Sequence, residues 1–253
     1  MSQMLVFCGP SLPAGTVARW LPAAKVFGPV ERGDVYRATA EGAVAIGIID
    51  GCGDRPSVEC QELLWALSHG VHVYGAGGIG ALRAAELDRF GMIGVGRVFI
   101  SFRDGSLNAD DEITVVHGSA EQRYRASSEA LVNIRASLER AVTKWVISEK
   151  DMNALVLMVR TQFYAMRTYP DMLELARQKN VLPGETLTRL GEWLNSTSEA
   201  HVDQKRIDAE AMIRRMASAR HDGRRERPGF AFQRTEAWEE FTRELASAAH
   251  PST

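Results

Sequence analysis

Few cysteines and no long apolar runs limit what this chain can be. Its 253 residues include three cysteines, Cys8, Cys52 and Cys60, which are odd in number and form no CxxC pair. This pattern predicts reduced thiols and excludes a disulfide framework. No window approaches the roughly 18 apolar residues of a membrane span, and the first residues lack the basic region of a signal peptide. We therefore expect a cytoplasmic protein that does not enter a membrane.

Several catalytic motifs are also absent. The sequence contains no GxxxxGK(S/T), no HExxH and no GxSxG. Their absence argues against a Walker-type phosphate loop, a zinc site and an ordinary α/β-hydrolase. A net charge of −2 supplies no overall field that would attract nucleic acid. The sequence therefore predicts no metal site and no nucleic-acid partner, and it implies no cofactor.

The N-terminal half alternates short apolar runs with helical patterns. The predicted strands are 4–8, 44–49, 71–74 and 97–102, and 113–117 is a strand or an extended segment. The predicted helices are 57–68, with Ser57 as its N-cap, and 80–90. Near-continuous apolar strands that alternate with helices are typical of a parallel sheet covered on both faces. We predict a Rossmann-like, doubly wound α/β core.

The second half is helical in its spacing of apolar residues. The predicted helices are 127–145, 149–166, 169–179, 184–195, 199–220 and 235–248, with an exposed polar loop at 221–229. We predict a core domain at residues 1–125 and a helical region at residues 126–253. The helical region either packs on the core or serves assembly into a homo-oligomer.

Cys8 is the first candidate catalytic residue, because it ends the first strand and precedes the Gly9-Pro10-Ser11 turn. Ligands of open α/β sheets bind outside the carboxyl ends of the strands. A thiol there is a candidate nucleophile, and the N–H groups of Gly9, Ser11 and Leu12 are candidate oxyanion donors. The alternative is a buried thiol that only completes the strand.

A glycine-rich turn follows the third strand. Gly75, Gly77 and Gly80 satisfy GxGxxG between a strand and a helix, and Gly78 adds a fourth glycine. Such a turn is typical of an anion-binding site at a helix N-terminus. The acid Asp104, placed at the end of the next strand, lies somewhat farther on than a dinucleotide site requires. The alternative is a tight turn that allows close helix–strand packing.

Three further groups are candidates for the same crevice. Asp50 follows a strand as a catalytic carboxylate or as a turn residue. Arg83 and Glu86 either face the crevice or form an i,i+3 pair on their helix. An acidic cluster either binds a divalent cation or is a solvated loop; its members are Asp104, Asp110, Asp111 and Glu112.

Several sequence blocks, in order, resemble the TfuA-like family. They are VFCGPSL (6–12), GDVYRA (33–38), AIGIIDG (45–51), GALRAAEL (80–87), FGMIGVG (90–96), RDG (103–105), DDE (110–112) and SEALVNIR (128–135). The resemblance covers residues ~4 to ~140. It implies a partner of a YcaO enzyme, which replaces a peptide-backbone oxygen by sulfur.

The resemblance also implies a reaction and further partners. TfuA-like proteins are thought to release sulfide by hydrolysing the C-terminal thiocarboxylate of a ThiS-like carrier, while YcaO binds the precursor peptide. Cys8 beside the Gly9–Ser11 turn would then attack the carbonyl carbon. The chain departs from the family at Cys60-Gln61-Glu62, where His-Lys-Glu is usual. It departs again before Gly80, where Gly77-Gly78-Ile79 stands in place of the usual small and hydroxylated residues. Lys25 is the only lysine of the α/β half, so His69, His72 and Arg83 are the candidate substitutes.

Three functional hypotheses remain open at this point. The first is a thiocarboxylate hydrolase that uses Cys8. The second is a non-catalytic adaptor that docks YcaO or the precursor peptide, because the usual cation and imidazole are missing. The third is a dinucleotide-binding enzyme that uses Gly75, Gly77 and Gly80.

Overall fold

A five-stranded parallel sheet organises the N-terminal half. The computed structural model describes residues 3–53, 55–221 and 229–249. The strands are β1 (Gln3–Phe7), β2 (Ala24–Phe27), β3 (Ala43–Ile48), β4 (His72–Gly75) and β5 (Ile93–Gly94), in the order β2-β1-β3-β4-β5. All pairs are parallel. Chain order reverses between β1 and β3, which makes their carboxyl ends the switch point of a doubly wound sheet.

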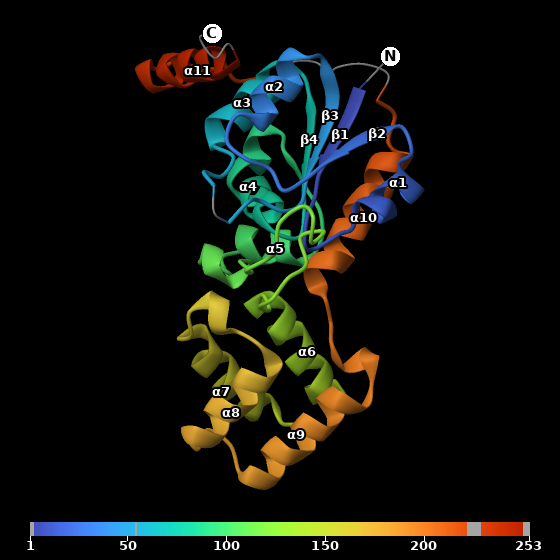
Figure 1. The fold of residues 1–253 in the computed structure, drawn as a ribbon, viewed down its shortest axis with the longest axis vertical. Coiled ribbons are helices and arrows are strands. Elements are labelled where there is room, and N and C mark those ends of the chain that lie inside the picture. Colours follow the sequence, from blue (N-terminus) through green and yellow to red (C-terminus); the bar gives the residue numbers. More distant parts are fainter. Residues whose placement is uncertain (1–2, 54, 222–228, 250–253) are drawn as a thin grey trace.

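Helices cover both faces of this sheet (Figure 1). One face packs against α2 (Asp34–Ala40), α3 (Cys60–Ser68), α4 (Ile79–Leu87) and α5 (Arg97–Arg103). The other packs against α1 (Ala14–Trp20) and α10 (Gln204–Ser218). Every residue of β3 is buried, as its uninterrupted apolar sequence predicts. The predicted α/β class with a helical C-terminal region is confirmed.

The C-terminal helices do not stay together. The helices α6 (Leu131–Thr143), α7 (Glu149–Arg160), α8 (Tyr169–Gln178) and α9 (Gly184–Ser196) share a separate apolar core. Helix α10 returns to the sheet, and α11 (Glu236–Ala249) lies beside α2 and α3 (Figure 1). Short 3-10 helices occupy Asp88–Phe90, Asp110–Glu112, Tyr164–Met166 and Ser198–Ala200. The predicted boundary at residue 125 remains a prediction, but the C-terminal part contributes α10 to the α/β layers.

The segment 97–102 is a helix, so the strand predicted there is wrong. Val98 and Phe99 are buried, whereas Ile100 is exposed, and this spacing suits a short amphipathic helix. The carboxylate of Asp208 in α10 accepts the N–H of Val98 at 2.7 Å and so caps the first turn. Because the run is helical, Asp104 does not end a strand.

Two smaller predictions also need correction. Glu59, not Ser57, is the N-cap of α3, where it forms a reciprocal capping box with Glu62. The segment 113–117 forms no strand beyond an isolated bridge between His117 and Ala126. The loop predicted at 221–229 lies largely outside the described residues. None of the helices in the described part of the chain is long and apolar enough to cross a bilayer.

Candidate functional site

A cavity of about 190 Å³ lies at the carboxyl ends of the strands, and we call it the polar cavity because Asp50, Ser57, His117 and Lys205 line it. Its walls come from the turn after β1, the segment after β3, the start of α4, the loop after α5 and the first turn of α10. The lining residues are Pro10, Asp50, Gly51, Cys52, Gly53, Ser57, Gly78, Ile79, Asp110, Ile113, Thr114, Val115, His117 and Lys205. The switch point therefore holds a cavity, as the topology rule predicts for a ligand site.

Asp50 ties the two central strand ends together. Its carboxylate is 2% exposed and accepts the N–H groups of Gly9 at 3.0 Å and Ser11 at 2.9 Å, and the Ser11 hydroxyl at 2.6 Å. These bonds stabilise its charge where water is excluded. They also occupy two of the three N–H groups predicted as oxyanion donors, those of Gly9 and Ser11. In this structure the Gly9–Ser11 turn binds a carboxylate of the protein itself.

Lys205 places a cation in this cavity, whereas Cys60 and Gln61 do not line it. Its Nζ lies 3.6 Å from Asp50 Oδ1 and donates to the carbonyl of Ile113 at 2.8 Å. The side chain reaches the cavity from α10 and is 5% exposed. An ammonium carries three N–H donors, and these contacts use at most two. Sequence reasoning missed Lys205 because it lies far along the chain in a segment that gives no local sign of a site.

His117 and Ser57 present unsatisfied polar atoms. The Nδ1 atom of His117 lies 2.8 Å from the Gly118 carbonyl. Since a carbonyl only accepts, Nδ1 carries the proton, and Nε2 of the neutral ring is an acceptor. Nε2 of His117 and Oγ of Ser57 are buried without a hydrogen-bond partner in the described structure. Both residues line the cavity, so an acceptor and a hydroxyl are left for a ligand.

Cys8 opens onto a different cavity. This second space, about 550 Å³, is lined by the turn after β1, the start of α1, the end of β2 and the loop residues Arg123 and Tyr124. Burial, followed by the nearby charge of Asp50, raises the pKa of the Cys8 thiol to about 12. The thiol donates to the Phe27 carbonyl at 3.8 Å. Cys8 is therefore protonated at neutral pH, which weakens it as a nucleophile.

The glycine-rich turn brings helix α4 close to the sheet. A Cβ on Gly80 would lie 1.9 Å from the Ile48 carbonyl oxygen, and one on Gly75 would lie 2.0 Å from the Gly80 oxygen. The N–H groups of Gly78 and Gly80 both donate to the Ile49 carbonyl. These two donors are thus engaged within the protein, which leaves them unavailable for a bound anion. Gly77, with φ of +70°, allows the turn itself.

Arg83 and Glu86 form a cluster of their own with Cys60. Arg83 Nη1 pairs with Glu86 Oε2 at 2.8 Å, and its Nε donates to the Val58 carbonyl at 3.1 Å. Cys60 Sγ donates to Glu86 at 3.2 Å. The i,i+3 pair is therefore present. Neither Arg83 nor Glu86 is among the lining residues of the described cavity, so neither lies with Asp50 and Lys205.

The two histidines proposed as substitutes lie elsewhere. His69 Nδ1 lies 2.7 Å from the Trp65 carbonyl at the end of α3. The His72 ring packs edge-on against His221 at 5.1 Å between centroids. His117 is the imidazole that reaches the described cavity.

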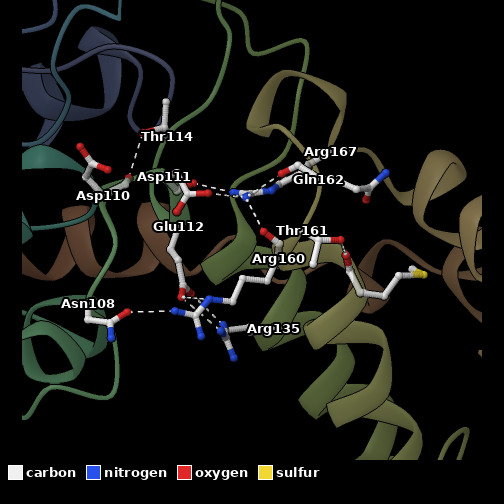
Figure 2. A network of polar contacts seen from close by, with 11 residues as sticks. Asn108, Asp110, Asp111, Glu112, Thr114, Arg135, Arg160, Thr161, Gln162 and Arg167 are labelled. Atoms are coloured by element: carbon white, nitrogen blue, oxygen red, sulfur yellow. Dashed lines mark hydrogen bonds and ion pairs between the residues drawn. The ribbon is translucent and has the colours of Figure 1, made fainter.

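The acidic cluster connects the α/β part to the helical bundle instead of forming a cation site (Figure 2). Glu112 is 1% exposed and accepts two N–H groups of Arg135, at 2.9 and 3.2 Å. Asp111 pairs with the buried Arg167 at 2.5 Å. Among the described residues no group of three or more His, Cys, Asp or Glu side chains is placed to bind a metal ion. Asp104 bonds to Ser106.

These features define a doubly wound α/β protein with a polar cavity at its switch point. Residues 50–168 match the family of TfuA-like proteins. The chain thus contains a TfuA-like domain, as its ordered blocks predict, and this family is linked to thioamidation. The matched region includes Asp50, Ser57 and His117, whereas Cys8 and Lys205 lie outside it. A search of curated proteins found no match.

Proposed function

We propose that this chain releases sulfide from the C-terminal thiocarboxylate of a ThiS-like carrier and delivers it to a YcaO enzyme acting on a precursor peptide. The observation that carries the proposal is the pair of unsatisfied atoms, His117 Nε2 and Ser57 Oγ, in a cavity that Asp50 and Lys205 also line. An acceptor, a hydroxyl donor and an ammonium in one site are the parts that acyl hydrolysis needs. Membership of the TfuA-like family supports the choice of substrate.

His117 is the general base of the proposed reaction. Its Nε2 removes a proton from water as the water oxygen attacks the carbonyl carbon. The carbon–sulfur bond then breaks and hydrosulfide leaves with the proton that His117 held. The thiocarboxylate and water thus give a carboxylic acid, which ionises, and hydrosulfide. The Gly118 carbonyl keeps the ring in the tautomer that this role requires.

Lys205 and Ser57 complete the electrostatics of the site. The ammonium of Lys205 has an N–H not used by Asp50 or Ile113, and Ser57 Oγ can donate to the oxygen that becomes negative. Asp50 is engaged with Gly9 and Ser11, so we assign it no proton transfer. Its negative charge holds Lys205 in place.

A water mechanism replaces the attack by Cys8. The raised pKa of Cys8 and its position on the second cavity both disfavour a thiolate at the reacting carbon. The glycine turn gives little support to a dinucleotide, because the N–H groups of Gly78 and Gly80 already have an acceptor.

An adaptor is the second candidate function. Among the described residues of the helical bundle, four large apolar side chains are exposed: Trp145 at 92%, Leu157 at 65%, Phe163 at 64% and Met166 at 59%. A contiguous patch of such groups is typical of a protein contact, whereas single exposed apolar residues are ordinary. Docking of a partner is compatible with hydrolysis, and the adaptor hypothesis differs only in requiring an inert cavity.

The test is sulfide release from a thiocarboxylated ThiS-like carrier. We expect His117→Gln to lower kcat by about 10²–10⁴-fold, the usual contribution of a general base. His69→Gln is the matched control, since its ring binds only at the end of α3. Cys8→Ala should keep activity near that of the wild type. Equal rates for His117→Gln and wild type would remove His117 from the mechanism, and no release by wild-type protein would leave the adaptor.

A further inference from the structure

Lys205 occupies a position that its own helix does not favour. It lies in the first turn of α10, where the helix dipole disfavours a positive charge. It is also 4% exposed, and lysine is rarely buried unless it is paired. The reason for a lysine here must therefore lie in its tertiary contacts.

The Lys205 ammonium joins two separate walls of the cavity. Its contact with Asp50 reaches the end of β3, and its 2.8 Å bond to the Ile113 carbonyl reaches the loop after α5. Four residues beyond Ile113 this loop carries His117. The loop is held again where the Val116 N–H donates to Ser128 Oγ at 2.8 Å. Lys205 and Ser128 thus anchor the segment at Ile113 and Val116, on the N-terminal side of His117.

The same loop covers both cavities. Ile113, Thr114, Val115 and His117 line the polar cavity, and Ala120, Arg123 and Tyr124 line the larger one. The rings of His117 and Tyr124 pack edge-on, 5.8 Å apart. A shift at the Ile113 anchor would therefore alter the lining of both cavities.

Contacts with α6 fix the position of Lys205 at the start of α10. Asn133 of α6 accepts the Lys205 backbone N–H at 3.1 Å and donates to Asp203, the N-cap of α10, at 3.0 Å. The Lys205 carbonyl lies 3.0 Å from where a Cβ on Gly77 would be. These contacts leave the first turn of α10 little freedom.

We propose that Lys205 is a positioning residue: its ammonium holds segment 113–117 over the cavity and thereby places His117. The catalytic consequence rests on the proposed hydrolysis, whereas the structural consequence does not. The C-terminal helical region therefore completes the site instead of being an appendage to the TfuA-like domain.

The first experiment does not depend on activity. Amide hydrogen exchange of the full chain is compared between Lys205→Met and Lys179→Met, a control at the exposed end of α8. We expect exchange to rise at least 10-fold in segment 113–126 for Lys205→Met alone, with α8 and α9 unchanged. Equal protection of 113–126 in the two variants would overturn the proposal. Where circular dichroism shows Lys205→Met to be unfolded, Lys205→Gln takes its place under the same criterion.

The second experiment measures sulfide release per folded molecule. Misplacement of a catalytic group by about 1 Å can cost about 10²-fold. Because Lys205→Met also removes the N–H proposed for the oxyanion, we expect it to lower kcat by at least that factor with little change in KM, and Lys205→Arg, which keeps a cation, to restore part of it. A kcat unchanged after correction for the folded fraction would refute the positioning role. No release by wild-type protein would refute the proposed hydrolysis, and the exchange experiment would still decide whether Lys205 holds the loop.

Discussion

Replacing Arg167 by methionine should destabilise the joint between the α/β part and the helical bundle. The side chain of Arg167 is fully buried, and its guanidinium donates to the Asp111 carboxylate at 2.5 Å. It also donates to the carbonyls of Asp111 at 2.6 Å and Gln162 at 2.9 Å (Figure 2). Methionine keeps the apolar stem but leaves both carbonyls without this donor.

The size of the effect follows from these contacts. Each buried acceptor that loses its partner costs about 1–3 kcal/mol. Two carbonyls therefore predict a loss of about 2–6 kcal/mol in the free energy of unfolding. The Asp111 carboxylate is 40% exposed, so water can solvate it and its contribution is small.

The assay is urea unfolding followed by circular dichroism and tryptophan fluorescence. Coincident transitions by both probes are needed because the bundle has a core of its own. Arg177→Met is the matched control, since Arg177 forms an exposed pair with Glu174 and its loss should cost less than about 1 kcal/mol. Destabilisation by Arg167→Met no larger than that of the control would refute the reasoning.

Three further predictions concern single groups. Burial raises the pKa of Glu62 to about 7, above its value in the unfolded chain. The protonated carboxyl therefore contributes to the stability of the fold at low pH, and this contribution is lost as pH rises through 7. The free energy of unfolding of Glu62→Gln, relative to that of the wild type, should rise by up to about 3 kcal/mol between pH 5 and pH 8. Parallel curves of unfolding free energy against pH for the two proteins would contradict this. At pH 8 iodoacetamide should alkylate Cys8 about 10³-fold more slowly in native than in urea-unfolded protein, and equal rates would disprove its burial as a thiol. Gly80→Ala should lower the free energy of unfolding, measured by urea titration, by at least about 1–3 kcal/mol, because the added Cβ meets the Ile48 carbonyl. Gly15→Ala is the control and should not destabilise the protein, since nothing lies within 4 Å of its added Cβ.

The fold class was predictable because local signals suffice for it. The runs at 4–8 and 44–49 are apolar on both faces, which is the mark of strands buried between two helical layers. The segment 97–102 misled the prediction because short apolar runs suit helix and strand equally well. Contact with Asp208, more than 100 positions away, caps it as a helix.

The candidate site was predictable only in part. Asp50 follows a buried strand, and the carboxyl ends of parallel strands converge on one edge of the sheet. Nothing in the local sequence distinguishes His117 or Lys205 from other residues of their kinds. No lysine was predictable beside Asp50, because Lys25 is the only lysine of the N-terminal half and Lys205 lies in α10.

The sequence by itself determined the layers, the glycine turn and the resemblance to TfuA-like proteins, because each depends on residues that are neighbours along the chain. Only the tertiary structure decided which groups share a cavity. Helix α10 covers the second face of the sheet with apolar residues such as Met212 and Ile213, and this packing carries Lys205 to Asp50. The same fold turns Cys8 toward another cavity. Burial of the sheet requires a covering helix, but the partner of Asp50 depends on how that helix is aligned.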